Sequence, residues 1–154
     1  MNTSAVIDTT EVDRLFKKLG SQYSKDIVTA LSATAQQGIV LILDRTEKGK
    51  GYKGQFKPYT PEYARSKAEG WPRTKTRSAF GGDPSGKVNL MVTGNMLSSI
   101  RSKVDKPNLT AELGFTRATE AKKAFWNNRI RPFFGFNTKE KNALRKFFYK
   151  RLTT

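Results

Sequence analysis

The first third of the chain has apolar residues at steps of three and four, the spacing that places side chains on one face of an α-helix. These positions are Val12, Leu15, Phe16, Leu19, Tyr23, Ile27, Leu31, Ala35, Ile39 and Ile42. Thr9 or Thr10 is suited to cap the start of the helix, because a threonine hydroxyl accepts from an unpaired backbone N–H. The pattern predicts helix over 9–45, which Gly20 divides into a short and a long part. At Gly38 the absence of a side chain predicts close packing against a neighbouring element.

Residues 88–115 have the pattern of short strands. The apolar run 88–92 predicts one strand, and Met96-Leu97 follows it as a turn or a single helical turn. Residues 99–104 alternate between apolar and polar positions, and 109–115 return after a turn at 107–108. Two such segments joined by a short turn are typical of an antiparallel hairpin.

The C-terminal third predicts helices at 119–126 and 138–152, separated by an irregular apolar segment at 131–136. Asn137 is followed three residues later by Glu140, the pattern of a helix-capping box. The apolar stripe of the last helix is Ala143, Leu144, Phe147 and Phe148. A second apolar cluster, which we expect to be core, is Phe125, Trp126, Phe133, Phe134 and Phe136.

Residues 46–87 differ from both flanks, because Gly, Pro, Lys and aromatic residues alternate there without helical or strand periodicity. Within them, 49–54 predicts a loop, and 61–68 predicts a short helix with Thr60 as its cap and Pro61 at its first position. Such a long connection is usually functional or disordered, and we interpret it as an extended basic arm that reaches a partner. Its candidate contact residues are Tyr52, Phe56, Tyr59, Tyr63, Trp71, Arg73, Lys75 and Arg77.

The predicted order of helix, arm, antiparallel strands and helix indicates an α+β fold. A long N-terminal helix, an extended basic arm, a small antiparallel sheet and a C-terminal helix make up this layout. The length of 154 residues predicts a single domain over 1–154.

The net charge of +16, from 29 Lys and Arg against 13 Asp and Glu, is unevenly distributed. It is −1 over 1–44, +7 over 45–87, +1 over 88–121 and +9 over 122–154. Such an imbalance is costly through self-repulsion unless an anionic partner is near. We expect contact with DNA or with an acidic protein surface, and the residues alone do not separate the two. The candidate contacts are Lys122, Lys123, Arg129, Arg131, Lys146, Lys150 and Arg151.

Composition also excludes several kinds of chemistry. The chain has no Cys and no His, which removes disulfides, thiolate or imidazole metal sites and the commonest general base. No apolar run approaches the roughly 20 residues of a membrane span, and residues 1–7 lack the features of a signal peptide. We therefore expect no enzyme activity, no cofactor and no membrane partner.

Three motifs resemble catalytic or nucleotide-binding patterns only in part. The glycines of 49–54 match a dinucleotide fingerprint, but a predicted helix precedes them where the fingerprint needs a strand. Residues 81–87 match part of a phosphate-binding loop, but Val88 replaces the hydroxyl residue that would hold Mg²⁺. Asp105 with Glu120 and Lys122 leaves a metal-dependent nuclease as a weak alternative.

Three stretches are similar to segments of one known family. They are GYKGQFKPYTPEYARSK at 51–67, LMVTGNMLSSI at 90–100 and RPFFGFNTKE at 131–140. In this order they resemble the virion-morphogenesis, or tail-completion, family of tailed bacteriophages, and more distantly the head–tail connector or neck proteins.

The resemblance implies a non-enzymatic structural subunit, made in the host cytoplasm and found in the virion, that completes or joins the tail to the head at the neck. It implies a homo-oligomeric ring, which we expect to be a hexamer, around the channel that genomic DNA crosses. Neighbouring neck, portal-adaptor or tail proteins would be its partners. The alternative is a basic DNA- or RNA-binding module that is not part of a virion.

Overall fold

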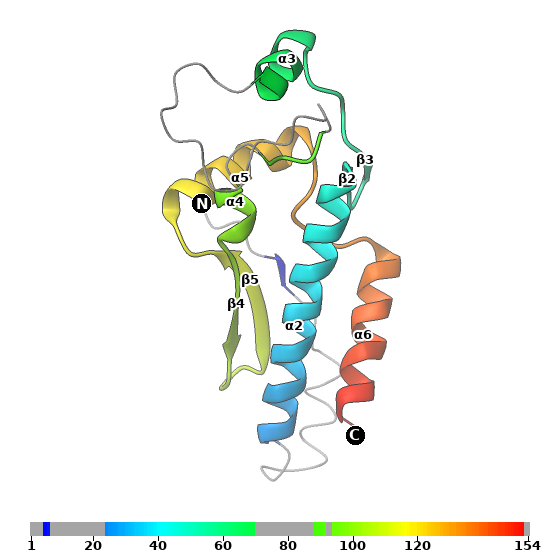
Figure 1. Ribbon diagram of the computed structural model, residues 1–154. Coiled ribbons are helices and arrows are strands. Elements are labelled where there is room, and N and C mark those ends of the chain that lie inside the picture. Colours follow the sequence, from blue (N-terminus) through cyan, green and yellow to red (C-terminus); the bar gives the residue numbers. More distant parts are fainter. Residues whose placement is uncertain (1–4, 7–23, 70–87, 92–93, 153–154) are drawn as a thin grey trace. The chain divides into compact units, whose positions relative to one another are not determined.

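The computed structural model describes residues 5–6, 24–69, 88–91 and 94–152, and its fold is α+β, as predicted (Figure 1). The chain divides into two compact units, which are described separately. The first unit comprises Met1–Leu41, Ile100–Gly114 and Phe136–Thr154, and the second comprises Ile42–Ser99 and Phe115–Gly135. The helices are α2 (Ser24–Glu47), α3 (Pro61–Glu69), α4 (Asn95–Ser98), α5 (Ala118–Ile130) and α6 (Thr138–Leu152). The strands are β1 (Ala5–Val6), β2 (Lys50–Gly51), β3 (Gly54–Gln55), β4 (Ile100–Asp105) and β5 (Thr110–Phe115).

The long helix α2 confirms the predicted apolar stripe from residue 24 onward. Its stripe residues Ile27, Leu31, Ala35, Ile39 and Ile42 are all buried. The earlier part of the prediction, including the division at Gly20, lies outside the described residues.

Helix α2 also corrects an expectation about membrane spans. Over Lys25–Glu47 it is long and apolar enough to cross a membrane by length and composition, so the statement that no apolar run reaches this length was wrong. Its apolar side chains Ile27, Leu31 and Ile42 are buried within the protein. Of its most apolar window, 44% is buried inside the protein, and the core helix of a globular protein meets the same length and composition test.

The core of the first unit forms between α2, the β4–β5 hairpin and α6, and Figure 1 shows α2 running between the other two. The hairpin was predicted, and Ala111 and Leu113 of β5 alternate inward as expected for a strand with one buried face. A two-residue strand, β1, extends the sheet to the order β1-β5-β4 by antiparallel pairing of Ala5 with Leu113. A side chain at Gly38 would lie 2.9 Å from the Phe136 ring, which explains the close packing predicted there.

The second unit contains the β2–β3 hairpin and helices α3 to α5. Residues 49–54, predicted as a loop, form a tight antiparallel hairpin in which Gly51 pairs with Gly54. The short helix α3 follows as predicted, and its Tyr63 N–H lies 3.4 Å from the Thr60 hydroxyl that was expected to cap it. The described part of the predicted arm is therefore folded into this unit.

The prediction of a strand at 88–92 is wrong for the residues of this segment that the structure describes. Residues 88–91 contain no strand, and Leu90 has a φ of 57°, a left-handed conformation that no strand residue adopts. Asn89 is buried, and its Oδ1 accepts hydrogen bonds from Lys67 Nζ at 2.7 Å and from the Met91 N–H at 3.1 Å. These bonds hold the segment in an irregular conformation.

The two C-terminal helices form where they were expected. The capping box is confirmed, because the Glu140 N–H donates to Asn137 Oδ1 and the Asn137 N–H donates to Glu140 Oε2, both at 2.9 Å. Helix α5 is longer than predicted and ends at Ile130. In the second apolar cluster, Phe133 and Phe134 belong to the core, as expected. Trp126 does not, because its exposed fraction is 54%.

Candidate functional site

Helix α5 of the second unit has two opposite faces. Glu120 and Ala124 are buried, whereas Lys122, Trp126 and Ile130, which follow one another at four-residue steps, are exposed. Residues four apart lie on the same side of a helix, so α5 presents a continuous outer face of cationic and apolar side chains. We call this the α5 outer face, and it comprises Lys122, Lys123, Trp126, Arg129 and Ile130.

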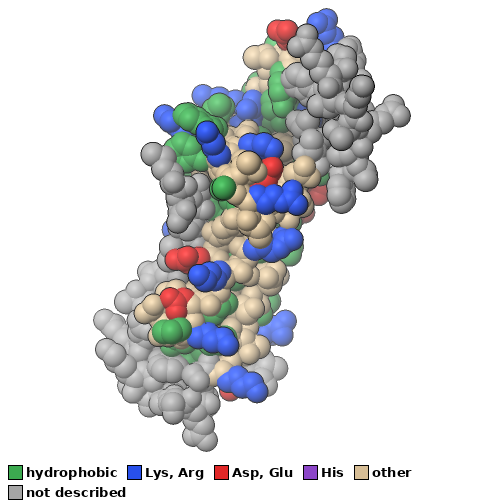
Figure 2. Space-filling view, turned by 90° about the vertical axis from the view of Figure 1, so that its left-hand side faces the viewer, with side chains coloured by type: hydrophobic (Ala, Val, Ile, Leu, Met, Phe, Trp, Pro, Cys, Tyr) green, Lys and Arg blue, Asp and Glu red, His purple; other side chains and the backbone are tan. Residues whose placement is uncertain are grey.

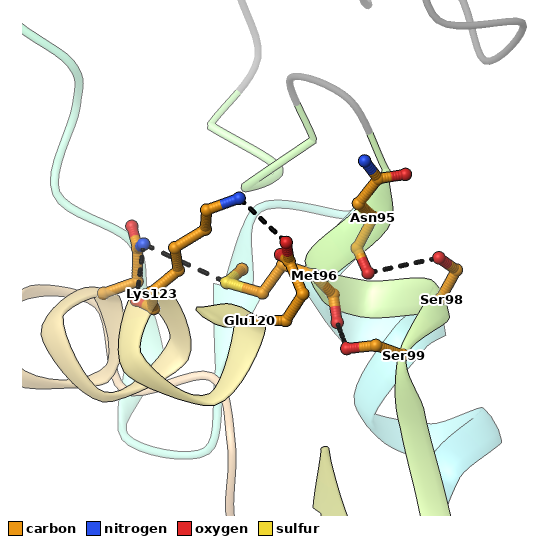
Figure 3. A network of polar contacts seen from close by, with 7 residues as sticks. Asn95, Met96, Ser98, Ser99, Glu120 and Lys123 are labelled. Carbon is orange, nitrogen blue, oxygen red and sulfur yellow. Dashed lines mark hydrogen bonds and ion pairs between the residues drawn. The ribbon is translucent and has the colours of Figure 1, made fainter. Parts of the chain in front are cut away.

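The inner face of α5 lies against α4, and Figure 3 shows side chains of both helices. Asn127 Nδ2 donates to the Lys123 carbonyl oxygen within α5 at 2.9 Å and lies 4.0 Å from the Met96 sulfur on α4. Glu120 Oε1 forms an ion pair with Lys123 Nζ at 2.8 Å. Of these contacts, the one from Asn127 to Met96 joins the two helices, and the burial of Glu120 and Ala124 defines which face of α5 points inward.

Arg129 packs against the aromatic rings of the outer face. Its guanidinium carbon lies 5.4 Å from the centroid of the Trp126 ring and 6.0 Å from that of Phe125. The two rings meet edge to face at 5.5 Å. A guanidinium stacked on a ring keeps its N–H edge available for a carboxylate or a phosphate. This arrangement can therefore bind an oxyanion beside an apolar surface.

Arg131 was predicted to contact an anionic partner, but the structure gives it a positioning role. It is half-buried, and its guanidinium donates to the carbonyl oxygens of Lys57 and Pro58 at 3.1 and 3.2 Å. It also lies 4.6 Å from the centroid of the Tyr59 ring. Arg131 thus fastens residues 57–59 to the end of α5, and no local sequence pattern indicates these partners, which lie 73 and 74 positions away.

Tyr59 and Tyr63, two aromatic residues of the predicted arm, are half-buried against one another with ring centroids 4.7 Å apart. Burial raises the pKa of each phenol above 10.0, since it disfavours the charged phenolate. The Tyr59 oxygen accepts a hydrogen bond from the Leu90 N–H at 3.3 Å. Lys67 is buried beside this pair, 5.2 Å from the centroid of the Tyr59 ring.

The remaining arm residues differ in how accessible they are. Tyr52 is half-buried and donates its backbone N–H to the Pro132 carbonyl at 3.0 Å. Phe56 is buried with an exposed fraction of 6%, so in this structure it belongs to the core of the unit and is not available to a partner. The other four predicted arm residues lie outside the described residues, namely Trp71, Arg73, Lys75 and Arg77.

Helix α6 of the first unit has a strongly cationic surface. It contains six Lys and Arg residues and one acid, Glu140, which belongs to the capping box. Lys146, Lys150 and Arg151, predicted as anion contacts, are all exposed, as is Lys139. Figure 2 shows the side on which the β4–β5 hairpin lies in Figure 1 and not the side of α6, and on that face the blue side chains of Lys and Arg also predominate over the red ones of Asp and Glu.

The two carboxylates considered for a nuclease are both engaged locally. Asp105 accepts hydrogen bonds from Asn108 Nδ2 at 2.7 Å and from the Asn108 N–H at 3.3 Å, and the side-chain bond is the main cause that lowers the pKa of Asp105. Glu120 is buried with its Oε1 bound to Lys123. In the part of the chain that the structure describes, no group of three acidic, His or Cys side chains is placed to hold a metal ion.

Ile130 was not among the predicted contact residues, and Trp126 was predicted to lie in the core. The available signal was the helical spacing, since Lys122, Trp126 and Ile130 fall on one face if the helix is extended past residue 126. No protein-family model, curated protein sequence or solved structure matches this chain.

Proposed function

We propose that this chain is a non-enzymatic structural subunit of a tailed-bacteriophage virion, which completes or joins the tail at the neck by assembling with copies of itself and with neighbouring virion proteins. Its basic surfaces bind anionic partners, either genomic DNA in the channel or acidic protein. The observation on which this depends is that the described parts of the three family-like stretches that belong to the second unit, within 51–67, 90–99 and 131–135, contact one another there.

The contacts between these stretches are specific. The first and third stretches meet where Gly51 lies so close to the Pro132 carbonyl oxygen that a Cβ would overlap it. They meet again where Arg131 binds the backbone of residues 57 and 58. The first and second stretches meet where the Tyr59 oxygen accepts from the Leu90 N–H. Residues that look family-like in sequence are thus those that build the unit, which favours a likeness in fold.

The placement of the charges also supports assembly on an anionic partner. Arg45 and Lys67 are buried and satisfy groups within the unit, Arg45 by donating to the carbonyl oxygens of Phe133 and Gly135 at 2.6 and 2.9 Å. The cations on the α5 outer face and on α6 are exposed instead. Exposed like charges at this density are stabilised by an anionic neighbour.

The test is the assembly state of the full chain and its presence in particles. Mass photometry with and without the neighbouring virion proteins is expected to show oligomers, and electron microscopy is expected to show a ring. Particles purified from cells that encode this sequence are expected to contain the chain in fixed stoichiometry. A strict monomer that never enters particles would contradict the proposal.

The cationic surface of α6 favours a second candidate, a DNA- or RNA-binding module outside any virion. Binding to nucleic acid with a steep dependence on salt, together with absence from particles, would favour this candidate. Negligible affinity for nucleic acid at about 0.15 M salt would remove it.

A further inference from the structure

We propose that the α5 outer face is the docking surface for an acidic protein segment that presents apolar side chains among its carboxylates. The inference rests on the proposed function, since it names which of the two anionic partners this surface binds. It depends on the combination of exposed apolar side chains, exposed cations and a stacked arginine on one helix.

The apolar part of the surface is Trp126 with Ile130, one helical turn further on. Their exposed fractions are 54% and 58%, and in the described part of the chain Val40 on α2 is the only other large apolar side chain that is exposed. Four residues of α-helix span about 6 Å, so the two side chains form one apolar patch. Tryptophan at such a patch is a frequent energetic centre of protein interfaces.

The cationic part surrounds this patch. Lys122 precedes Trp126 by one turn, and Arg129 lies against the Trp126 ring. Neither forms an ion pair with a carboxylate that the structure describes, whereas Lys123 is paired with Glu120. A partner with carboxylates on both sides of an apolar anchor would match the charges and the patch together.

Nucleic acid fits this surface less well than protein does. Ile130 has neither the charge to meet a phosphate nor a ring on which a base would stack, and the Trp126 ring already contacts a guanidinium. Helix α6 offers the contrast, since its outward positions Lys139, Lys146 and Lys150 have no exposed large apolar side chain among them. A second copy of this chain would bring mainly cations to this face, so the self-assembly of the proposed function is expected to use other surfaces.

The experiment uses the full chain with Trp71→Phe, so that Trp126 is the sole tryptophan and its fluorescence reports on the surface. The probes are a synthetic peptide of Glu with Leu at helical spacing, poly-glutamate of the same length, oligothymidylate, duplex DNA, and vesicles of phosphatidylcholine and phosphatidylglycerol. We expect the Leu–Glu peptide to move Trp126 emission to shorter wavelength and to bind about tenfold more tightly than poly-glutamate.

Variants then test the residues, with binding followed by the anisotropy of labelled peptide. Trp126→Ala and Ile130→Ala are each expected to lower the affinity for the Leu–Glu peptide about tenfold. Neither variant is expected to change the affinity for poly-glutamate. Val40→Ala removes an equally exposed apolar side chain from a different helix and is expected to change neither affinity. Because Trp126 and Ile130 are exposed, their variants should retain the unfolding midpoint of the parent chain.

Three results would overturn the inference. The first is equal affinity for the Leu–Glu peptide and poly-glutamate, and the second is that oligothymidylate or duplex DNA quenches Trp126 fluorescence and binds more tightly than the Leu–Glu peptide. The third is that the chain binds the vesicles in preference to the peptide. The proposed function fails separately. A chain that enters particles but does not distinguish the two peptides contradicts only the docking surface. A chain that prefers the Leu–Glu peptide but is absent from particles contradicts the virion assignment and leaves the surface standing.

Discussion

Gly51 shows how a single residue fixes the contact between the β2–β3 hairpin and the segment after α5. A Cβ there would overlap the Pro132 carbonyl oxygen and lie 2.9 Å from the Phe56 ring, and backbone oxygen cannot rotate away. We expect Gly51→Ala to lower the free energy of unfolding by about 1–3 kcal/mol through overpacking. Gly114→Ala is the matched control, because nothing lies within 4 Å of its Cβ, and its effect should stay within about 0.5 kcal/mol. Urea unfolding measures both, and equal effects would contradict the packing argument.

The Tyr59–Tyr63 pair predicts a dependence on alkaline pH. Burial raises both pKa values, so the unfolded chain loses these protons near pH 10.0 while the folded chain retains them. The unfolded state then binds fewer protons, and stability falls as the pH rises above about 10. Tyrosinate absorbance should show two tyrosines that ionise later in the native protein than in denaturant, and Tyr63→Phe should remove one of them. Coincident native and denatured titrations would show that the pair is not buried.

Residues whose roles depend on distant partners could not be predicted from the sequence. Arg131 was counted as an exposed cation, but it binds carbonyl oxygens of residues 57 and 58. Leu90 was placed in a strand, but the bond from its N–H to Tyr59 and the burial of Asn89 hold it in a left-handed conformation. Local sequence patterns do not indicate such partners, because only the tertiary fold brings these distant residues together.

At the scale of elements, local signals were sufficient where the stabilising contacts are themselves local. The capping box before α6 was predicted because Asn137 and Glu140 satisfy each other's backbone N–H groups within four residues. The apolar stripe of α2 was predicted for the same reason, since helical spacing alone defines it. The length of α5 was underestimated because its last turn ends in the exposed residues Arg129 and Ile130, which do not extend an apolar stripe that faces the core.

The capping box gives a prediction for the stability of α6. Asn137→Ala removes the acceptor for the Glu140 N–H, and we expect a loss of about 1 kcal/mol in the free energy of unfolding. Asn142→Ala makes the same substitution at an exposed position inside α6, where alanine is a better helix former and no loss is expected. Urea unfolding and far-ultraviolet circular dichroism measure both variants. If Asn142→Ala destabilises as much as Asn137→Ala, the cap is not the cause.

At the scale of the whole molecule, the net charge follows from the sequence, but the sequence does not show which cations are buried or paired and which are exposed. The +16 total includes the buried Arg45 and Lys67, the positioning residue Arg131 and the paired Lys123, none of which is simply an exposed cation. Among the exposed cations that remain, one group lies beside exposed apolar side chains on α5, and another lies on α6, which has no exposed large apolar side chain. This difference suggests that acidic protein and nucleic acid would bind to different helices.

That division predicts which lysines set the salt dependence of DNA binding. Each lysine that neutralises a duplex phosphate contributes about 0.9 to the slope of log affinity against log salt. Lys139, Lys146 and Lys150 on α6 are all exposed, so replacing the three with Gln should reduce the slope by about 3. Replacing Lys25, Lys103 and Lys106, which are exposed elsewhere, removes the same net charge and should leave the slope nearly unchanged. Equal reductions in the two triple variants would mean that DNA responds to net charge alone and that α6 is not its binding surface.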